Sequence, residues 1–252
     1  MDCLLTSCYL PPVEWFTKLY GYERVWVEQY DNYEKQTYRN RCIIDSPNGP
    51  LPLSLPVEKT TEGKCLMKDI RISDHNHWRT IHWHALESSY LTSPFFEYYQ
   101  DDFRPFYERK WSFLIDFNEA LVEKCCELID LQPNIQRTPS YQPNAQCPML
   151  NAQWSMVKNA IAQEQSQACL SSAEHEHFRR SQWSMVNGQC SMDFRPSIHP
   201  KHDFSADKEF VATPYYQVFQ HKHGFLPNLS IVDLIFNMGP ESLLVLRDSF
   251  VG

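Results

Sequence analysis

The architecture of this chain follows from residues 3–28, CLLTSCYLPPVEWFTKLYGYERVWVE. Cys3–Cys8 is a short apolar run that ends before two consecutive prolines. Apolar residues then recur at helical spacing from Val13 to Tyr20, which predicts a short helix with Pro12 near its first turn. Arg24–Glu28 is rich in β-branched and aromatic residues and predicts a second strand. A strand, a helix and a strand in this order indicate a parallel pair at the centre of a sheet.

A β-hairpin is predicted immediately after this unit. Gln36–Ile44 and Leu51–Val57 flank the turn Ser46-Pro47-Asn48-Gly49, which carries both a proline and an Asn-Gly turn signal. The sheet is therefore expected to be mixed.

The rest of the chain is expected to be largely helical. From Trp78 to Leu131 the apolar residues take a helical period, which predicts three consecutive helices with breaks near Ser93-Pro94 and Lys110-Trp111. Ser230 and Asp233 have the spacing of a capping box at the start of an apolar helix, and a last helix is expected over Ser242–Leu246. We predict an α/β fold, with α+β as the alternative: a central mixed sheet packed with a helical middle section and C-terminal helices.

One segment differs in composition from the rest. Residues 132–190 contain ten glutamines and two copies of a Gln-Trp-Ser-Met-Val sequence, which are too few for a repeat architecture. We predict that 1–131 and 191–252 together form one domain, and that 132–190 is a Gln-rich insertion, partly helical around 154–165 or mobile.

Composition excludes several functional classes. Lys plus Arg number 23 and Asp plus Glu number 31, a net charge of −8, so no basic excess is present to hold a nucleic-acid backbone. The chain has seven glycines, and none are spaced for a GxGxxG turn or a Walker phosphate loop. Because those loops need glycine for close approach to phosphate, a Walker-type NTPase and a standard Rossmann dinucleotide binder are excluded.

The sequence favours a cytoplasmic location. The first residues lack the basic and long apolar regions of a signal peptide. The longest apolar stretches, such as Ile231–Phe236, are far shorter than the ~20 residues of a membrane span. Nine cysteines without a CxxC pair indicate free thiols rather than a disulfide framework.

Cys8 is the first candidate for catalysis. It lies where the first strand should end and the following helix begin, at the sheet edge where α/β proteins usually bind ligands. A thiol near a helix N-terminus has a lowered pKa, so Cys8 is a candidate nucleophile with a histidine as base. The alternative is an inert, half-buried cysteine.

The histidines suggest a metal site as another alternative. All ten fall in five close pairs, namely His75/His77, His82/His84, His175/His177, His199/His202 and His221/His223. On a strand, an HxH pair places two imidazoles on one face, as metal sites require. On a helix the same spacing separates the rings by about 200°, so His82 and His84 would not share a metal. A zinc enzyme stays an alternative, and no residue is assigned as a metal ligand.

A dense cationic cluster lies on the predicted hairpin. Lys35, Arg39 and Arg41 alternate along one strand and would share a face, where they suit a phosphate or carboxylate. The alternative is a charged solvent face paired with Glu34 and Asp45.

Two blocks of sequence, Cys8–Phe16 and Tyr33–Arg41, resemble the WbqC-like protein family. Further blocks resemble it in the same order: Asn48-Gly49 with Leu53 to Val57, Trp78 with His82, Tyr90, Pro94 and Phe95, and Tyr216-Gln217 with Phe225, Pro227 and Leu229 to Pro240. The family is associated with bacterial O-antigen, lipopolysaccharide and related surface-polysaccharide gene clusters. The resemblance thus implies a transferase acting on a small molecule or sugar, with acyl or aminoacyl transfer onto an amino sugar as one reaction; it leaves the cofactor open.

The resemblance also implies residue roles. His82 would be the general base, with Cys8 the second catalytic candidate, and Arg39 and Arg41 would bind phosphate or carboxylate. The remaining predicted substrate-binding residues are Tyr9, Lys35, Asn40, Tyr90, Tyr216, Gln217 and Asp233. The rival hypothesis is a non-catalytic carbohydrate-binding or scaffold protein, for which aromatic residues, 14% of the chain, would supply contact surfaces.

Overall fold

The computed structural model describes residues 1–58, 64–143, 183–186 and 189–251. Its strands are β1 (Asp2–Thr6), β2 (Arg24–Glu28), β3 (Arg41–Ile44), β4 (Leu51–Ser54), β5 (Ile135–Arg137), β6 (Trp183–Val186) and β7 (Gln189–Asp193). The α-helices are α1 (Val13–Gly21), α2 (Trp78–Tyr90), α3 (Phe96–Glu108), α4 (Leu114–Leu128), α7 (Gln220–His223), α8 (Ile231–Met238) and α9 (Ser242–Ser249). Short 3₁₀ helices span Met67–Asp69, His75–His77, Phe204–Ala206 and Gly239–Glu241.

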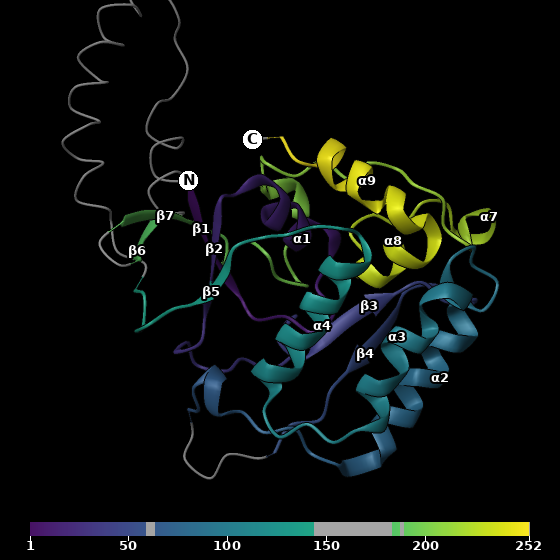
Figure 1. Ribbon diagram of the computed structural model, residues 1–252, viewed down its shortest axis with the longest axis horizontal. Helices are drawn as coiled ribbons and strands as arrows, with labels where there is room; N and C mark the ends of the chain where they lie inside the picture. Colours follow the sequence, from purple (N-terminus) through teal and green to yellow (C-terminus); the bar gives the residue numbers. More distant parts are fainter. Residues whose placement is uncertain (59–63, 144–182, 187–188, 252) are drawn as a thin grey trace, which may run out of the picture.

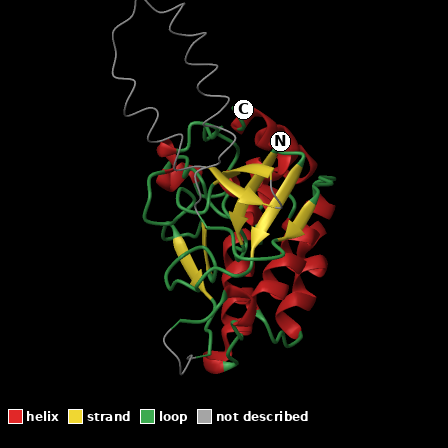
Figure 2. Cartoon of the chain, turned by 90° about the vertical axis from the view of Figure 1, so that its left-hand side faces the viewer, coloured by secondary structure: helices red, strands yellow, loops and turns green. Residues whose placement is uncertain are grey.

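The central sheet has the order β5-β2-β1-β7-β6 (Figure 1). Figure 2 shows the strands in yellow, with helices in red next to them. β5, β2, β1 and β7 run parallel, and β6 pairs antiparallel with β7. The predicted mixed α/β fold and its β-α-β opening are therefore confirmed: β1 leads through α1 to β2, with Cys3 opposite Val25. β1 and β2 are almost wholly buried because apolar residues dominate both strands.

The sheet topology identifies where a ligand would be expected. From β1 the chain moves to β2 and β5 on one side, and it later returns to β7 on the other side of β1. The boundary between β1 and β7 is thus a topological switch point, and open α/β sheets bind ligands outside the carboxyl ends of their strands at such a point. Thr6, Glu28, Arg137 and Asp193 occupy the carboxyl ends of the four parallel strands.

The hairpin is present, but its first strand is shorter than predicted. β3 begins at Arg41, and β3 and β4 form a separate two-stranded sheet. The expectation that this hairpin makes the central sheet mixed is therefore wrong, because β6 supplies its antiparallel strand. Residues 35–40 instead form turns in which Gln36 has a φ of 61°. The prediction that Lys35, Arg39 and Arg41 share one strand face is therefore wrong, since a turn breaks the alternation on which it depends.

The three predicted middle helices are α2, α3 and α4, and the two predicted C-terminal helices are α8 and α9. The capping-box prediction is wrong, because the Ser230 hydroxyl donates to the Leu10 carbonyl at 2.8 Å and makes no cap bond to α8. None of the helices in the described part of the chain has the length and apolarity to cross a membrane.

Aromatic side chains fill the core between these helices. The Phe236 ring on α8 lies 5.1–5.2 Å from the rings of Tyr90, Phe96 and Phe103. A second group of stacked and edge-on rings surrounds Phe117 on α4. Much of the aromatic content is thus committed to packing and does not form exposed platforms for a ligand.

The predicted insertion at 132–190 lies only partly within the described residues. β5 pairs with β2 along one side of the sheet, and β6 and β7 form its other side. These stretches therefore belong to the same sheet as β1 and β2. Residues 144–182, which include the helix predicted around 154–165, lie outside the described residues.

Candidate functional site

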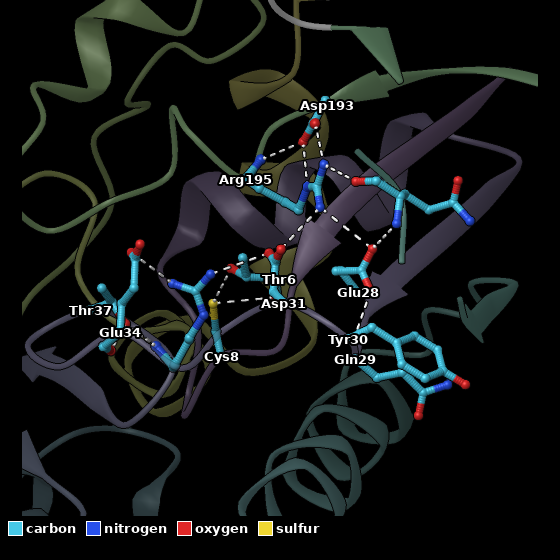
Figure 3. A network of polar contacts seen from close by, with 12 residues as sticks. Thr6, Cys8, Glu28, Gln29, Tyr30, Asp31, Glu34, Thr37, Asp193 and Arg195 are labelled. Carbon is cyan, nitrogen blue, oxygen red and sulfur yellow. Dashed lines mark hydrogen bonds and ion pairs between the residues drawn. The ribbon is translucent and has the colours of Figure 1, made fainter. Parts of the chain in front are cut away.

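Charged side chains gather at the carboxyl edge of the parallel strands (Figure 3). Glu28 ends β2 and Asp193 ends β7, and the loops that follow carry Asp31 and Arg195. We call Glu28, Asp31, Glu34, Arg39, Asp193 and Arg195 the edge cluster. Parallel pairing brings these residues together because it places the ends of distant strands side by side.

Arg195 joins the two strand ends. Its Nε and Nη2 donate to the two carboxylate oxygens of Asp193 at 2.9 and 2.7 Å, the two-point geometry that suits a guanidinium. Its Nη1 lies 3.5 Å from Glu28 Oε2 and 3.4 Å from Asp31 Oδ1. The Arg195 side chain is 5% exposed, so these ion pairs are largely shielded from water.

Glu28 ties β2 to the segment after β5. One carboxylate oxygen accepts hydrogen bonds from the Tyr30 amide at 2.8 Å and the Thr138 hydroxyl at 2.9 Å. The other carboxylate oxygen accepts a hydrogen bond from the backbone amide of Gln142 at 2.9 Å. Thr138 and Gln142, which the sequence assigned to the insertion, therefore help to build this edge.

Arg39 completes the edge cluster. Its guanidinium nitrogens lie 3.4 Å from Asp31 and 3.4 Å from Glu34, so Asp31 is shared between Arg39 and Arg195. The cluster holds four carboxylates and two guanidinium groups, a net charge of −2. This charge balance disfavours phosphate at Arg39, whose predicted anion-binding role stays untested.

A pocket of about 170 Å³ opens between α4 and the carboxyl ends of β1, β2 and β5. Its lining residues are Ser7, Cys8, Trp15, Val27, Asn118, Glu119, Val122, Glu123, Ile135, Gln136 and Arg137. Asn118 connects it to the edge cluster, because its Nδ2 donates to Ser7 Oγ at 3.1 Å and to the Arg39 carbonyl at 2.9 Å. The pocket and the cluster therefore share one edge of the sheet.

Cys8 lines this pocket, but its environment suppresses thiolate formation. α1 begins only at Val13, so Cys8 is not at a helix N-terminus. Burial raises the pKa of the Cys8 thiol to about 12, outweighing the hydrogen bond with Thr6 and the charge of Arg39. Its role as a nucleophile stays a prediction, and the geometry does not favour it.

We expect iodoacetamide at pH 8 to alkylate Cys65 well before Cys8 in the folded protein. Cys65 is only partly buried, whereas about one Cys8 thiol in 10⁴ is ionised at that pH if its pKa is about 12. Peptide mapping by mass spectrometry would measure both rates. Labelling of Cys8 as fast as that of Cys65 would contradict this expectation.

His82 is held inside the protein among aromatic rings. Its Nδ1 is hydrogen-bonded to the Tyr9 hydroxyl at 3.0 Å, and that hydroxyl also bonds Tyr107 at 2.9 Å. Burial lowers the pKa of His82 to about 4, although a hydrogen bond to the Ser54 backbone opposes the shift. Neither Tyr9 nor His82 lines the pocket. Their catalytic and substrate-binding roles stay predictions.

Two of the other predicted site residues near the hairpin make hydrogen bonds across it. Arg41 donates to the Ser54 hydroxyl at 3.0 Å, and Asn40 donates to the Leu55 carbonyl at 2.8 Å. Lys35 is exposed in the turn before β3. These contacts fix the hairpin, and none of the three residues lines the pocket.

Three other predicted residues meet in one buried network. Asp233 accepts hydrogen bonds from the Tyr90 hydroxyl at 2.8 Å and from Gln217 Nε2 at 3.2 Å. Tyr216 makes none of these hydrogen bonds and is 52% exposed. Its neighbour Tyr215, which is 6% exposed, donates to Asp233 at 2.7 Å instead. The network links α2, α8 and the loop at 215–217 and does not line the pocket.

The histidine pairs do not form a metal centre in the described residues. His82 is buried while His84 is exposed and paired with Glu87, as expected for HxH on a helix. No group of three His, Cys, Asp or Glu side chains suited to a metal ion occurs in the part of the chain that the structure describes. His175 and His177 lie outside it.

The comparisons with known proteins agree with the resemblance in the sequence. The model of the WbqC-like protein family matches residues 7–245, nearly the whole chain. The chain belongs to this family. This WbqC-like chain is also 21% identical over 245 residues to a protein of Mycobacterium tuberculosis (strain ATCC 25618 / H37Rv) described as "Uncharacterized protein Rv1507c". The similarity covers 97% of this chain and 96% of the mycobacterial protein. No solved structure matches the WbqC-like chain.

Several residues of the site were not selected from the sequence of this WbqC-like protein, namely Glu28, Asp31, Asn118 and Arg195. Glu28 closes a predicted strand, so the rule that ligand-binding residues follow strand ends would have found it. Asn118 gives no sequence signal, because a polar residue on a helix is ordinarily exposed.

Proposed function

We propose that this WbqC-like protein is a transferase of bacterial surface-polysaccharide biosynthesis that binds its acceptor sugar at the carboxyl edge of the sheet. Acyl or aminoacyl transfer onto an amino sugar is the reaction we favour. Family membership supports the biological setting. The observation that carries the site is the pocket beside α4, joined to the edge cluster by Asn118.

The chemistry of this edge suits a sugar better than a phosphate. Carboxylates, guanidinium groups and an amide present both acceptors and donors, and a sugar hydroxyl can pair with either. The net charge of −2 in the edge cluster repels anionic groups. We therefore assign the acceptor, and not a phosphate-bearing donor, to this edge.

Transfer to an amine or hydroxyl needs a base to take one proton, and His199 is our candidate. It is half-buried in the loop after β7, and Glu34 and Arg39 act on its charge. Burial is the first cause that lowers the pKa of His199, which favours the neutral imidazole at pH 7. Its Nδ1 accepts a hydrogen bond from the Lys201 backbone amide at 3.1 Å, so Nδ1 would take the proton in place of that bond.

The second candidate function is non-catalytic carbohydrate binding. The observation that favours it is the burial of both groups first chosen for catalysis: the pKa of Cys8 rises to about 12 and that of His82 falls to about 4. If His199 is inactive as a base, the same edge would bind a sugar without turning it over.

The experiment is a mass-spectrometric assay of transfer from acyl-CoA and aminoacyl donors to a panel of sugars, together with titration calorimetry for binding. His199→Gln is expected to lower product formation by about 10²-fold or more while sugar affinity changes less than about threefold. The control is His221→Gln, an exposed histidine on α7.

Each outcome has one meaning. Sugar binding without product from the wild-type protein with any donor would favour the carbohydrate-binding function. Absence of binding to every sugar would contradict both candidate functions.

A further inference from the structure

Four cations gather where the chain enters α2 and α4. They are Arg71, Arg79, Arg109 and Lys110, and we call them the basic patch. An antiparallel bridge pairs Arg71 with Phe113, and the Nε of Arg79 donates to the backbone carbonyl of Arg109 at 3.1 Å. None of the four lines the pocket beside α4 or belongs to the edge cluster. The basic patch is therefore a second surface, built by other segments than the carboxyl edge of the sheet.

Two of these arginines lie over aromatic rings and have no carboxylate partner. The guanidinium carbon of Arg109 is 3.8 Å from the centre of the Trp111 ring, and that of Arg71 is 4.8 Å from the centre of the Phe113 ring. Both arginines are exposed, and neither forms an ion pair within the residues that the structure describes. Stacking on a ring uses the face of the guanidinium and restricts its motion, so the N–H donors at its edge are held ready for an anion.

The other two cations are held by one carboxylate. The two carboxylate oxygens of Asp74 lie 2.6 Å from Arg79 and 2.7 Å from Lys110. The turn between Asp74 and Arg79 places Asn76 and His77 at φ values of 62° and 47°, in the left-handed region that residues with a side chain seldom adopt. Backbone of this kind costs energy and tends to occur at sites that bind ligands. The turn thus orients two further cations beside the stacked arginines.

The basic patch is positive on a protein whose net charge is −8. Two carboxylates lie on or beside its segments: Asp74, and Glu58, whose backbone amide donates to the Arg71 carbonyl at 3.0 Å. Glu108 at the end of α3 is already paired with Arg104 at 2.8 Å. Four cations against two carboxylates leave a local charge of +2. A local excess of this sign attracts anions even when the whole protein is acidic.

Phosphate is the anion that fits this arrangement. A guanidinium binds phosphate or carboxylate through two parallel hydrogen bonds, but a phosphate group offers more acceptor oxygens and more charge than one carboxylate. We infer that the basic patch binds the phosphate group of a ligand, with Arg71 and Arg109 donating to its oxygens and the other two cations adding charge. The inference rests on the proposed function where the ligand is a phosphate-bearing donor, which we placed away from the acceptor edge. A phospholipid headgroup carries the same group.

The test has two arms at pH 7, one for each source of phosphate. Titration calorimetry with inorganic diphosphate measures binding of the free group, with malonate as the carboxylate control. Co-sedimentation with vesicles of phosphatidylcholine, alone or mixed in equal parts with phosphatidylglycerol, measures binding of the lipid headgroup. Diphosphate is expected to bind at least about tenfold more tightly than malonate, the usual value of one further hydrogen bond to a charged group. Added salt should weaken the binding because the charges are exposed.

Variants locate the binding. The double variant Arg71→Gln/Arg109→Gln is expected to bind at least about tenfold more weakly, because it removes both unpaired guanidinium groups. Arg71→Lys/Arg109→Lys keeps the charge but loses the planar donors, so it should also bind more weakly than the wild type. The matched control is Arg24→Gln/Arg247→Gln, which removes the same charge from β2 and α9. Figure 1 shows α9 and the start of α4 at opposite ends of the molecule, so the control should change affinity less than about twofold.

The outcomes separate this inference from the proposed function. Diphosphate binding that the glutamine variant loses supports the phosphate site, and the same result without any transfer product would contradict the proposed function alone. Binding only to the phosphatidylglycerol vesicles, with the same loss, supports the site and identifies a lipid headgroup as its ligand. Equal binding of malonate and diphosphate, full binding by the lysine variant, equal losses in the matched control, or no binding in either arm would overturn the inference.

Discussion

Replacement of Arg195 by methionine is expected to lower the free energy of unfolding by about 3 to 5 kcal/mol, the usual cost of removing one partner from a buried ion pair. Its guanidinium is the cation that contacts Glu28, Asp31 and Asp193 together. Methionine fills a similar space without charge, so the cost comes from carboxylates left buried and poorly compensated. Urea denaturation at pH 7 measures this free energy.

The matched control is Arg104→Gln, which removes a guanidinium from an exposed pair with Glu108 on α3. Exposed pairs contribute about 0.2–1 kcal/mol, so a small loss is expected there. A loss in Arg195→Met no larger than in this control would show that the edge cluster does not hold the strand ends together.

Local patterns were enough to predict most of the elements. The opening β-α-β unit follows from a change of apolar period between Leu5 and Phe16, and that signal depends on neighbours in the chain only. The helix breaks near Pro94 and Lys110 follow from the same kind of local rule. Such features are encoded within ten to twenty residues, so tertiary contacts need not be known.

The site could not be predicted in the same way because long-range contacts build it. Arg195 and Glu28 are separated by 167 positions in the chain. Arg39 was expected on a strand face, but the turn at Gln36 redirects it into the edge cluster. The pairing of these charges depends on the order of the strands in the sheet. β7 lies beside β1 in that sheet, and the sequence that precedes β7 gave no sign of a strand at the centre of the molecule.

The resemblance to the family selected residues that lie close together in the structure, but it did not identify their contacts. Tyr90, Gln217 and Asp233 come from distant blocks and lie in one network. Their hydrogen bonds join secondary-structure elements, so the blocks contain residues that stabilise the fold as well as any that bind substrate. Similarity of sequence does not separate these two roles; burial and hydrogen-bond partners do.

Replacement of Asp233 by alanine is expected to lower the free energy of unfolding at pH 7 by about 2 to 4 kcal/mol, because it removes the acceptor of several buried donors and leaves a cavity. The donors are the hydroxyls of Tyr90 and Tyr215 and the amide of Gln217. These three residues lie outside α8, so their separation from Asp233 would loosen α8 from α2. Urea denaturation again gives the measurement.

The unfolding free energy lost in Asp233→Ala should depend on pH in a defined direction. Burial raises the pKa of Asp233 to about 6, although hydrogen bonds from Tyr215 and Tyr90 oppose the shift. The unfolded chain has a pKa near 3.9 for this group, so the folded state binds the proton more tightly and gains stability as the pH falls through 6. The difference in unfolding free energy between the wild type and Asp233→Ala should therefore grow by about 1 kcal/mol from pH 7 to pH 5. A difference that shrinks over this range would contradict a raised pKa.

Two adjacent tyrosines provide the sharpest control for the Asp233 network. Tyr215→Phe removes one buried hydroxyl that donates to Asp233, and we expect it to cost about 1 to 3 kcal/mol because the bond is to a charged acceptor. Tyr216→Phe makes the same chemical change on an exposed side chain and should stay within about 0.5 kcal/mol. If Tyr216→Phe instead weakens sugar binding without affecting stability, the predicted substrate contact at Tyr216 is supported. Equal stability losses in both variants would mean that the network has been assigned to the wrong tyrosine.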